Sequence, residues 1–329
     1  MSDPHEHHIQ HTSSNLTFAD RWDHILARVG WRRNGHRVAP GLYQLGRPSD
    51  VSPVFVTANY TLSFDALRSA LSGIDGHLLV LDTKGINVWC AAGKGTFGTD
   101  ELVHRIESSR LRDVVRHRAL IVPQLSAPGV AAHVVKKRTG FKVEYGPVLA
   151  ADLPEYLQTR EATPQMRRVR FGLGDRAVLI PVELTSAAVL LAVVVFGLRL
   201  VIADAPAIPD AAFLAAILAG TIAFPILLPW LPTRDFSSKG FILGGLVALT
   251  FATVSLWNPV RPALWLQAID ALTLVLIASS ITAFLALNFT GATTFTSRSG
   301  VRREMFSYIP VMAWMAGVGV ASRVVLYFV

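Results

Sequence analysis

Residues 53–81 read PVFVTANYTLSFDALRSALSGIDGHLLVL, and this stretch decides the fold of the first half of the chain. Two short apolar runs, 53–57 and 77–81, flank a segment in which Phe64, Leu67 and Leu71 recur at helical spacing. Short apolar runs that alternate with amphipathic helices are typical of α/β units. The stretch therefore predicts a strand, a helix and a second strand, the beginning of a small Rossmann-like sheet.

The same alternation continues as far as residue 145. Strands are predicted at 119–122 and 141–145, and helices are predicted at 99–106 and 130–139. Together with the stretch above they define a domain that is predicted to span residues 51–155. A domain of this length is large enough to bury one hydrophobic core.

Residues 1–50 precede this domain and are interpreted as a variable N-terminal segment without a signal peptide. Residues 18–29 have apolar residues at helical spacing, whereas 31–50 are punctuated by Gly and Pro and are predicted to be irregular. The start of the segment is polar, and it is interpreted as an incidental tail or as a metal-binding tract. Its histidines are His5, His7, His8 and His11.

The second half of the chain is predicted to lie in a membrane. The 329 residues are 51% hydrophobic and only 16% charged, which is too apolar for two soluble domains. An Arg-rich linker at 156–178 leads to a predicted all-α transmembrane domain at 179–329. Five segments are each long enough to cross the hydrocarbon core as a helix: 179–202, 212–231, 240–257, 264–287 and 305–328.

The positive charges orient this bundle. The net charge of +8 would suggest a nucleic-acid partner in a soluble protein, but the basic residues lie largely beside the apolar segments. The second loop carries Arg234 and Lys239, the fourth loop is also basic, and the third has only Arg261. The positive-inside rule therefore places the soluble domain in the cytoplasm and Val329 outside, in a bacterial or archaeal cytoplasmic membrane. Lipid is an expected partner, and nucleic acid is not.

Polar and proline residues within the apolar segments carry further expectations. Asp270 is an intramembrane acid, for which a structural partner such as a helix dipole or an Arg is expected. Arg323 is expected to keep its charge in water by snorkelling. Pro225 and Pro229 are expected to kink the second span, where neighbouring helices satisfy the freed carbonyls.

Cys90 is the single cysteine of the chain. A lone thiol excludes an internal disulfide, a zinc cluster and a self-held iron–sulfur cluster. The residues around it, 87–97, read NVWCAAGKGTF. They do not form a phosphate-binding P-loop, because Val88 occupies the position of the first glycine and Gly95 replaces the Ser or Thr that would hold magnesium.

Two further interpretations of this segment stay open. Residues 93–98 formally match GxGxxG, but a nucleotide site would require residues 86–92 to form the preceding strand. Alternatively, Cys90 stands among small residues that let a large flat ligand approach closely, so that the sulfur reaches its central metal while Trp89 anchors the segment. Against both stands the ordinary fate of a free cysteine, which is burial as a small hydrophobic residue.

Residues 87–94, NVWCAAGK, resemble the cap-helix motif of the mercury-methylating corrinoid proteins of the HgcA family, which is related to the large subunit of the corrinoid iron–sulfur protein of acetyl-CoA synthesis. The resemblance extends to VTANY at 56–60 and LSFD at 62–65, which look like the first strand and corrinoid-facing loop of that family. The five C-terminal spans and residues 289–301 also look like family segments.

The resemblance implies a cobalamin-type corrinoid that is bound base-off, with the Cys90 thiolate as the lower axial ligand of cobalt. Sulfur ligation makes the methyl group on cobalt more transferable as a carbanion or radical, the polarity that electrophilic inorganic Hg(II) requires. Thr57, Asn59 and Tyr60 would contact the corrin or merely form a turn. The residues implied to shape the cap around Cys90 are Asn87, Val88, Trp89, Ala91, Ala92, Gly93 and Lys94.

The family also implies partners. Because the chain has no second thiol, electrons must come from outside, and the family implies a ferredoxin with two [4Fe–4S] clusters, whose cysteines are expected to deliver Hg(II). A methyl-folate-linked methyltransferase is the expected methyl source. Two alternatives stay open: a corrinoid methyl carrier with another acceptor, and a membrane receptor or transporter whose cytosolic domain binds a nucleotide.

The remaining candidates are loops and histidines. The loops 123–129 and 146–148 follow predicted strands and are interpreted either as ligand-facing segments or as plain connections. His104, His117 and His133 are predicted to be solvated surface residues rather than metal ligands.

Overall fold

The structure is a computed structural model that describes residues 9–32, 35–201, 207–257, 263–293 and 295–328. The chain divides into two compact units. The first comprises Met1–Ala27 and Trp31–Val169, and the second comprises Arg28–Gly30 and Arg170–Val329. Several sequence expectations lie outside the described residues: the tail histidines His5, His7 and His8, the end of the first span, Arg261 and Val329.

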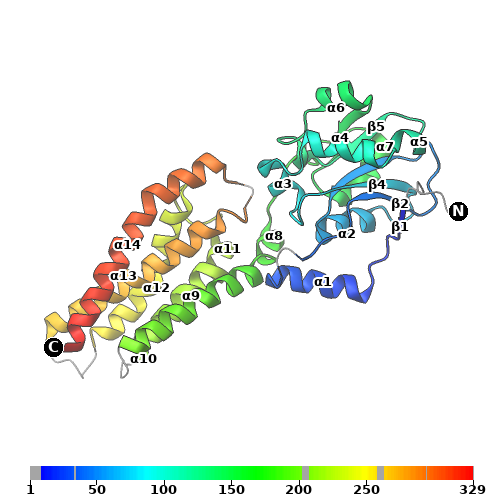
Figure 1. Ribbon diagram of the computed structural model, residues 1–329. Coiled ribbons are helices and arrows are strands. Elements are labelled where there is room, and N and C mark those ends of the chain that lie inside the picture. Colours follow the sequence, from blue (N-terminus) through cyan, green and yellow to red (C-terminus); the bar gives the residue numbers. More distant parts are fainter. Residues whose placement is uncertain (1–8, 33–34, 202–206, 258–262, 294, 329) are drawn as a thin grey trace. The chain divides into compact units, whose positions relative to one another are not determined.

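A mixed six-stranded sheet forms the centre of the first unit (Figure 1). Its order is β1-β2-β4-β3-β5-β6, in which β3 to β6 run parallel to one another and β2 runs antiparallel to β4. The α/β prediction is confirmed. The strands are β1 (Gln10–Thr12), β2 (Gly41–Leu45), β3 (Val54–Ala58), β4 (Gly76–Leu81), β5 (Ala119–Val122) and β6 (Lys142–Tyr145).

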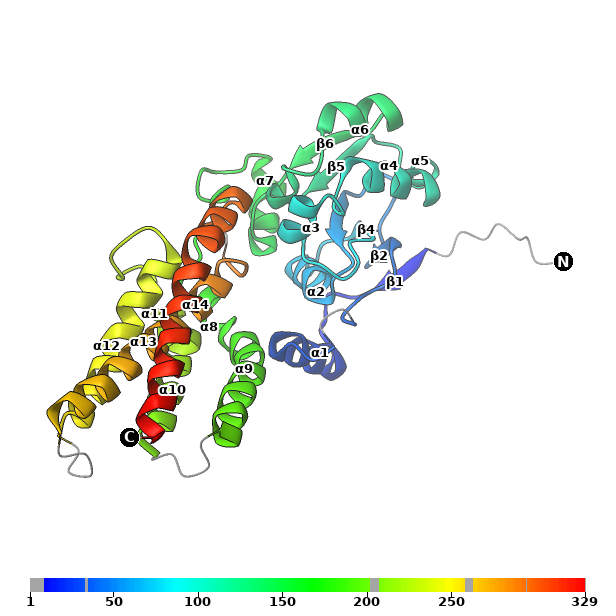
Figure 2. The ribbon, with the colours of Figure 1, turned by 60° about the vertical axis from the view of Figure 1, so that its left-hand side comes forward.

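Helices cover both faces of this sheet, so the central parallel strands β3 and β4 are buried along their whole length. In β3, Val54, Val56 and Ala58 pack on one face and Phe55 packs on the other. α2 (Thr61–Ala70) and α7 (Leu153–Thr159) cover the Phe55 face. The opposite face carries α3 (Val88–Lys94), α4 (Thr99–Ser108), α5 (Leu111–Val114) and α6 (Ala132–Thr139). Both views show α2 and α4 on opposite sides of the sheet (Figures 1 and 2).

The N-terminal segment contributes more to the sheet than the sequence indicated. Residues 18–29 form α1 (Phe18–Val29) as predicted, but the irregular assignment of 31–50 is wrong at β2. Leu42 and Leu45 of this strand are 3% and 2% exposed because β2 pairs with β4. The glycines that bound the strand, Gly41 and Gly46, concealed it in the sequence, since Gly is typical of turns.

The second unit is helical. Three of its described helices are long and apolar enough to cross a membrane: α12 (Phe236–Ser255), α13 (Leu264–Phe289) and, within α14 (Arg298–Phe328), the segment Ser299–Leu326. These helices are compatible with a membrane-anchored region. The apolar run Ala211–Leu227 is shorter. The other elements are α8 (Leu173–Ala177), α9 (Ile180–Val201), α10 (Ala207–Leu218), the π-helical turn η3 (Ala219–Ala223) and α11 (Phe224–Leu227).

Glycine allows α12 and α13 to approach closely. A Cβ atom added at Gly240 would lie 2.6 Å from the Cα of Ala283, and one added at Gly244 would lie 2.6 Å from the Cβ of Thr282. Two glycines four residues apart form the small-residue stripe by which membrane helices bring their backbones together.

Polar groups inside this unit find partners in the chain. Asp270 pairs with Arg323, and the hydroxyl of Ser255 donates a 2.6 Å hydrogen bond to Asp270 Oδ2. The expectation of a structural partner for Asp270 is confirmed. The expectation that Arg323 snorkels into water is wrong, because the residue is buried and its charge is paired with that of Asp270.

The two prolines of the expected second span interrupt its helix. Pro229 cannot donate to the carbonyl of Pro225, four residues earlier. Arg176 Nη1 lies 2.9 Å from that carbonyl oxygen and donates to it instead. The π-helical turn η3 lies immediately before α11, whose second residue is Pro225. The freed carbonyl is therefore satisfied, as expected, but by an arginine side chain of α8.

Candidate functional site

The order of the strands defines one edge of the sheet as the place for a ligand. The chain runs from β3 to β4 by way of α2, and then crosses back over β3 to reach β5 on its other side. Between β3 and β5 the strand order reverses. Open α/β sheets bind ligands outside the carboxyl ends of the strands at such a switch point. The segments that begin there are residues 59–60 after β3 and 123–129 after β5.

Residues 87–94 form a capped helix beside this edge. Asn87 is the N-cap of α3, and its side-chain oxygen accepts a 2.9 Å hydrogen bond from the backbone N–H of Cys90. Gly95 ends the helix with φ 85°, a left-handed conformation that favours glycine. The strand that a nucleotide-binding GxGxxG would require is therefore a helix, and that interpretation is wrong.

The packing of α3 separates its small residues into two groups. Val88, Ala91 and Ala92 are buried in the core, where Ala91 is 0% exposed. Helical spacing places Cys90 and Gly93 on another side of the helix, and Cys90 is partly exposed there. The small residues around the thiol thus do not form a single surface, since the two alanines face the sheet.

The surface next to Cys90 is open. A Cβ atom added at Gly93 would meet nothing within 4 Å, whereas one added at Gly98 would lie 2.7 Å from the carbonyl oxygen of Gly95. Lys94 is exposed, and Trp89 is half-buried. α3 packs against β3 and against η1 (Gln124–Ser126), the short helix that follows β5. The partly exposed thiol therefore belongs to an element that lies at the switch point.

Asn59 holds the loop that leads into α3. Its side chain is buried, and its Oδ1 accepts 3.0 Å hydrogen bonds from the backbone N–H groups of Thr83 and Gly85. Its Nδ2 donates to Asp82 Oδ1 at 3.1 Å. The amide group is thus engaged within the chain, so Asn59 positions the entry to α3. The sequence signal for this loop is the run DTKG at 82–85 directly after a strand, which is typical of a turn.

The other two residues expected near a ligand lie in different surroundings. Thr57 is 2% exposed and, by strand alternation, shares the face of Phe55 and α2. Tyr60 is the N-cap of α2 and is half-buried. Of the three residues predicted after the first strand, Tyr60 presents the most surface.

The histidines do not gather into a site. Among the described residues, no group of three His, Cys, Asp or Glu side chains could hold a metal ion. His104 and His133 are exposed, and His117 Nε2 lies 2.8 Å from the carbonyl oxygen of Ser52. His77, which the sequence did not single out, is 1% exposed, and burial lowers its pKa below the ordinary value of 6.5.

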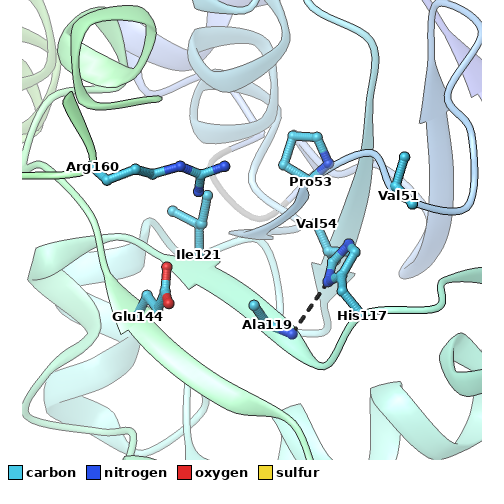
Figure 3. Close-up of a pocket in the computed structure, with 8 residues that line it drawn as sticks. All are labelled: Val51, Pro53, Val54, His117, Ala119, Ile121, Glu144 and Arg160. Carbon is cyan, nitrogen blue, oxygen red and sulfur yellow. Dashed lines mark hydrogen bonds between the residues drawn. The ribbon is translucent and has the colours of Figure 1, made fainter. Parts of the chain in front are cut away.

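A cavity of about 260 Å³ lies away from α3, at the opposite edge of the sheet (Figure 3). It is bordered by Val54 and Ala119, which begin β3 and β5, and Arg160 and Glu144 line another side. Because ligands of open α/β sheets bind at the carboxyl ends of the strands, this cavity does not mark the candidate site.

Comparison with known proteins relates the first unit to proteins of acetyl-CoA synthesis. Residues 29–157 match the family described as CO dehydrogenase/acetyl-CoA synthase delta subunit. Subunit gamma of the acetyl-CoA decarbonylase/synthase complex of Methanopyrus kandleri is 37% identical over 131 residues, which are 38% of this chain and 27% of that protein. The corresponding subunit of Archaeoglobus fulgidus is 34% identical over 124 residues, or 37% of this chain and 26% of that protein.

The corrinoid/iron-sulfur protein large subunit of Moorella thermoacetica is 26% identical over 153 residues, which are 44% of this chain and 34% of that protein. The chain thus spans between about a quarter and a third of the length of these three relatives. The relationship to the corrinoid iron–sulfur large subunit that the sequence predicted is confirmed. The narrower resemblance to mercury-methylating proteins stays a prediction, and Arg170–Val329 falls outside the residues that match the family.

Proposed function

We propose that this chain is a membrane-anchored corrinoid protein that transfers a methyl group from Cys90-ligated cobalt to inorganic Hg(II) and so forms methylmercury. One observation carries the proposal: the NVWCAAGK segment is a short helix at the switch point of the sheet that keeps its cysteine partly exposed. The segment lies within residues 29–157, the part of the chain related to a corrinoid protein.

The side chains of α3 fit a large flat cofactor. Gly93 lies on the side of the helix that carries Cys90, and a Cβ atom added there would meet nothing within 4 Å, so this position leaves space for a macrocycle. Val88, Ala91 and Ala92 fix the opposite side of α3 in the core. Asn87 caps the helix through the amide of Cys90, which holds the backbone of that residue in place.

In this proposal the residues of α3 divide the work. A corrinoid supplies a methyl group carried on cobalt when it is bound. Cys90 would hold the corrinoid through its sulfur in the proposed base-off form, and Trp89, Gly93, Lys94 and Tyr60 would border it. Asn59 would orient α3 by holding the loop that precedes it, and Thr57 would support the end of β3 without contacting the corrinoid.

The remaining components come from outside the chain. The one thiol of the chain would be committed to cobalt, so a ferredoxin with two [4Fe–4S] clusters would supply electrons, and the cysteines of the ferredoxin would pass on Hg(II) as substrate. A methyl-folate-linked methyltransferase supplies the methyl group. In the membrane, five spans at 179–202, 212–231, 240–257, 264–287 and 305–328 anchor a cytoplasmic corrinoid domain at 51–155 through the linker 156–178.

The absorption spectrum of the purified full chain, reconstituted with cobalamin, tests this proposal. We expect a sulfur-to-cobalt charge-transfer band in the wild type that is lost in Cys90→Ala and kept in Ser72→Ala, a control on the exposed surface. Gly93→Val should weaken cobalamin binding by about tenfold, or ~1.4 kcal/mol, without loss of folding, because its side chain would fill the open face. A spectrum that is the same with and without the Cys90 thiol would refute cobalt ligation.

Methyl transfer identifies the acceptor. With the ferredoxin and Hg(II) present, the methylated wild-type protein is expected to produce methylmercury. If the charge-transfer band is present and methylmercury is not formed, the chain is a corrinoid methyl carrier with another acceptor.

A further inference from the structure

α1 is attached to the first unit by its polar side. Arg68 Nη2 donates a 2.8 Å hydrogen bond to Asp20 Oδ2, and His24 Nε2 lies 2.7 Å from Asp65 Oδ2. Asp65 and Arg68 belong to α2 and are 1% and 6% exposed. The side of α1 that faces the α/β unit is therefore the charged one.

The apolar side of α1 points away from the unit. Phe18, Trp22 and Ile25 are 82%, 53% and 51% exposed, and their spacing places them on one stripe of the helix. None of the residues of α1 is buried. A surface helix of a globular protein normally turns its apolar stripe to the core and its charges to water, so the orientation of α1 is the reverse of the usual one.

Positive charges border this stripe. Arg21 and Arg28 are exposed and lie seven positions apart, so that they line one edge of the helix. Trp31 and Arg32, directly after the helix, are also exposed. The acidic residues Asp20 and Asp23 are turned to the other side, where Asp23 Oδ1 lies 2.7 Å from His36 Nδ1. The outward face is thus apolar and cationic.

We infer that α1 lies in the headgroup region of an anionic lipid bilayer, with Phe18, Trp22 and Ile25 among the upper acyl chains. A helix with an apolar stripe, an aromatic residue and a basic border has the chemistry of an interfacial membrane helix. The basic border is complementary to anionic headgroups. The same chain has three described helices that could cross a bilayer, so a lipid surface is available to it. The inference does not depend on any cofactor.

Spin-label accessibility of the full chain in lipid nanodiscs tests this inference. The only native cysteine is removed by Cys90→Ser, and a nitroxide is attached at Trp22→Cys or Ile25→Cys. Both positions are more than half exposed, so the label disturbs no core. Ser72→Cys is the matched control, because Ser72 is exposed and lies in the turn that follows α2. Collisions with oxygen, which concentrates in lipid, are compared with collisions with a water-soluble nickel chelate.

In discs of phosphatidylcholine and phosphatidylglycerol in equal amounts, labels at 22 and 25 should collide with oxygen several-fold more, relative to nickel, than the label at 72. The contrast should shrink in pure phosphatidylcholine and with Arg21→Glu plus Arg28→Glu. Nickel accessibility equal to that of the control would overturn the inference, because α1 would then face water. Low accessibility to both reagents would also overturn it, since the stripe would then be covered by protein, a second copy or another partner.

Discussion

At the scale of single residues, one side chain supplies the reactive group of the proposed site and other side chains hold it in position. Cys90 provides the sulfur of the proposed site, but its place depends on two asparagines. Asn87 caps α3 through the Cys90 amide, and Asn59 holds the loop before the helix. Of the two, only Asn59 is buried, and its amide is a rigid support because each lost hydrogen bond weakens the pairing of a buried partner.

Replacing Asn59 by Ala should loosen the entry to α3. The backbone N–H group of Gly85 would lose its acceptor, at a cost of about 1–3 kcal/mol for a buried group left unsatisfied, while that of Thr83 would keep only the carbonyl oxygen of Leu81. Hydrogen exchange of residues 82–94 in the full chain should become faster. Asn15→Ala, at an exposed asparagine, is the control, and unchanged exchange in Asn59→Ala would show that the loop is held by other contacts.

His77 should make the stability of the first unit depend on pH. Burial lowers the pKa of its imidazole below 6.5, and the neighbouring His117 acts in the same direction. Below pH 6.5 the unfolded chain therefore binds a proton that the folded chain refuses. The midpoint of thermal unfolding should fall as the pH decreases from 6.5 towards the folded pKa. His77→Gln should flatten this slope, and an identical slope in the variant would assign it to other groups.

At the scale of elements, side-chain size decides which helices touch. Ala91 and Ala92 let α3 lie directly on the core, and Gly240 and Gly244 let α12 lie directly on α13. Both contacts are made by residues that add little surface of their own. The stabilisation comes from the van der Waals contacts that form when two backbones approach closely, an approach that larger residues would prevent.

The contact between α12 and α13 should therefore be sensitive to one glycine and not to its neighbour. Gly244→Ala would place its Cβ 2.6 Å from Thr282 and 3.0 Å from the Cα of Ser279, so overpacking should cost about 1–3 kcal/mol. At Gly245 the nearest atom is 3.7 Å away, so Gly245→Ala should be neutral. Thermal unfolding of the detergent-solubilised chain measures the stability of each variant. Equal midpoints for the two variants would contradict the packing argument.

At the scale of the whole molecule, one chain joins an α/β unit and a helical unit. The family match covers residues 29–157, within which lie β2 to β6 and α3. The apolar helices follow after it, and their loops carry the basic residues. The proposed arrangement places the site on the cytoplasmic side of a membrane.

A reporter fused after Val329 should reveal this arrangement. Five spans put the C-terminus outside when the first unit is inside. An alkaline phosphatase fusion should therefore be active and a green fluorescent protein fusion dark, with the reverse result for a fusion in the basic loop before α12. Fluorescence of the C-terminal fusion would mean an even number of spans.

Much of the fold could be predicted, and the predictable parts share a physical cause. Strands β3 to β5 are largely apolar runs because both of their faces are covered, and α1 and α2 repeat their apolar residues at helical spacing. β2 was missed because glycines bound it and its pairing with β4 is made across the chain. The site was predicted only in part, since which neighbours of Cys90 face the core depends on the packing of α3.

The sequence by itself determined the alternation of strands and helices from β3 to β6, the apolar segments of the second half, and the presence of a single cysteine. Each of these properties depends on composition or on residues a few positions apart, so they can be read along the chain. Only the tertiary structure decided that Asn59 supports α3, that Asp270 meets Arg323, and that α1 turns its apolar stripe outward. Those outcomes depend on contacts between residues far apart in the chain, which form only when the elements pack.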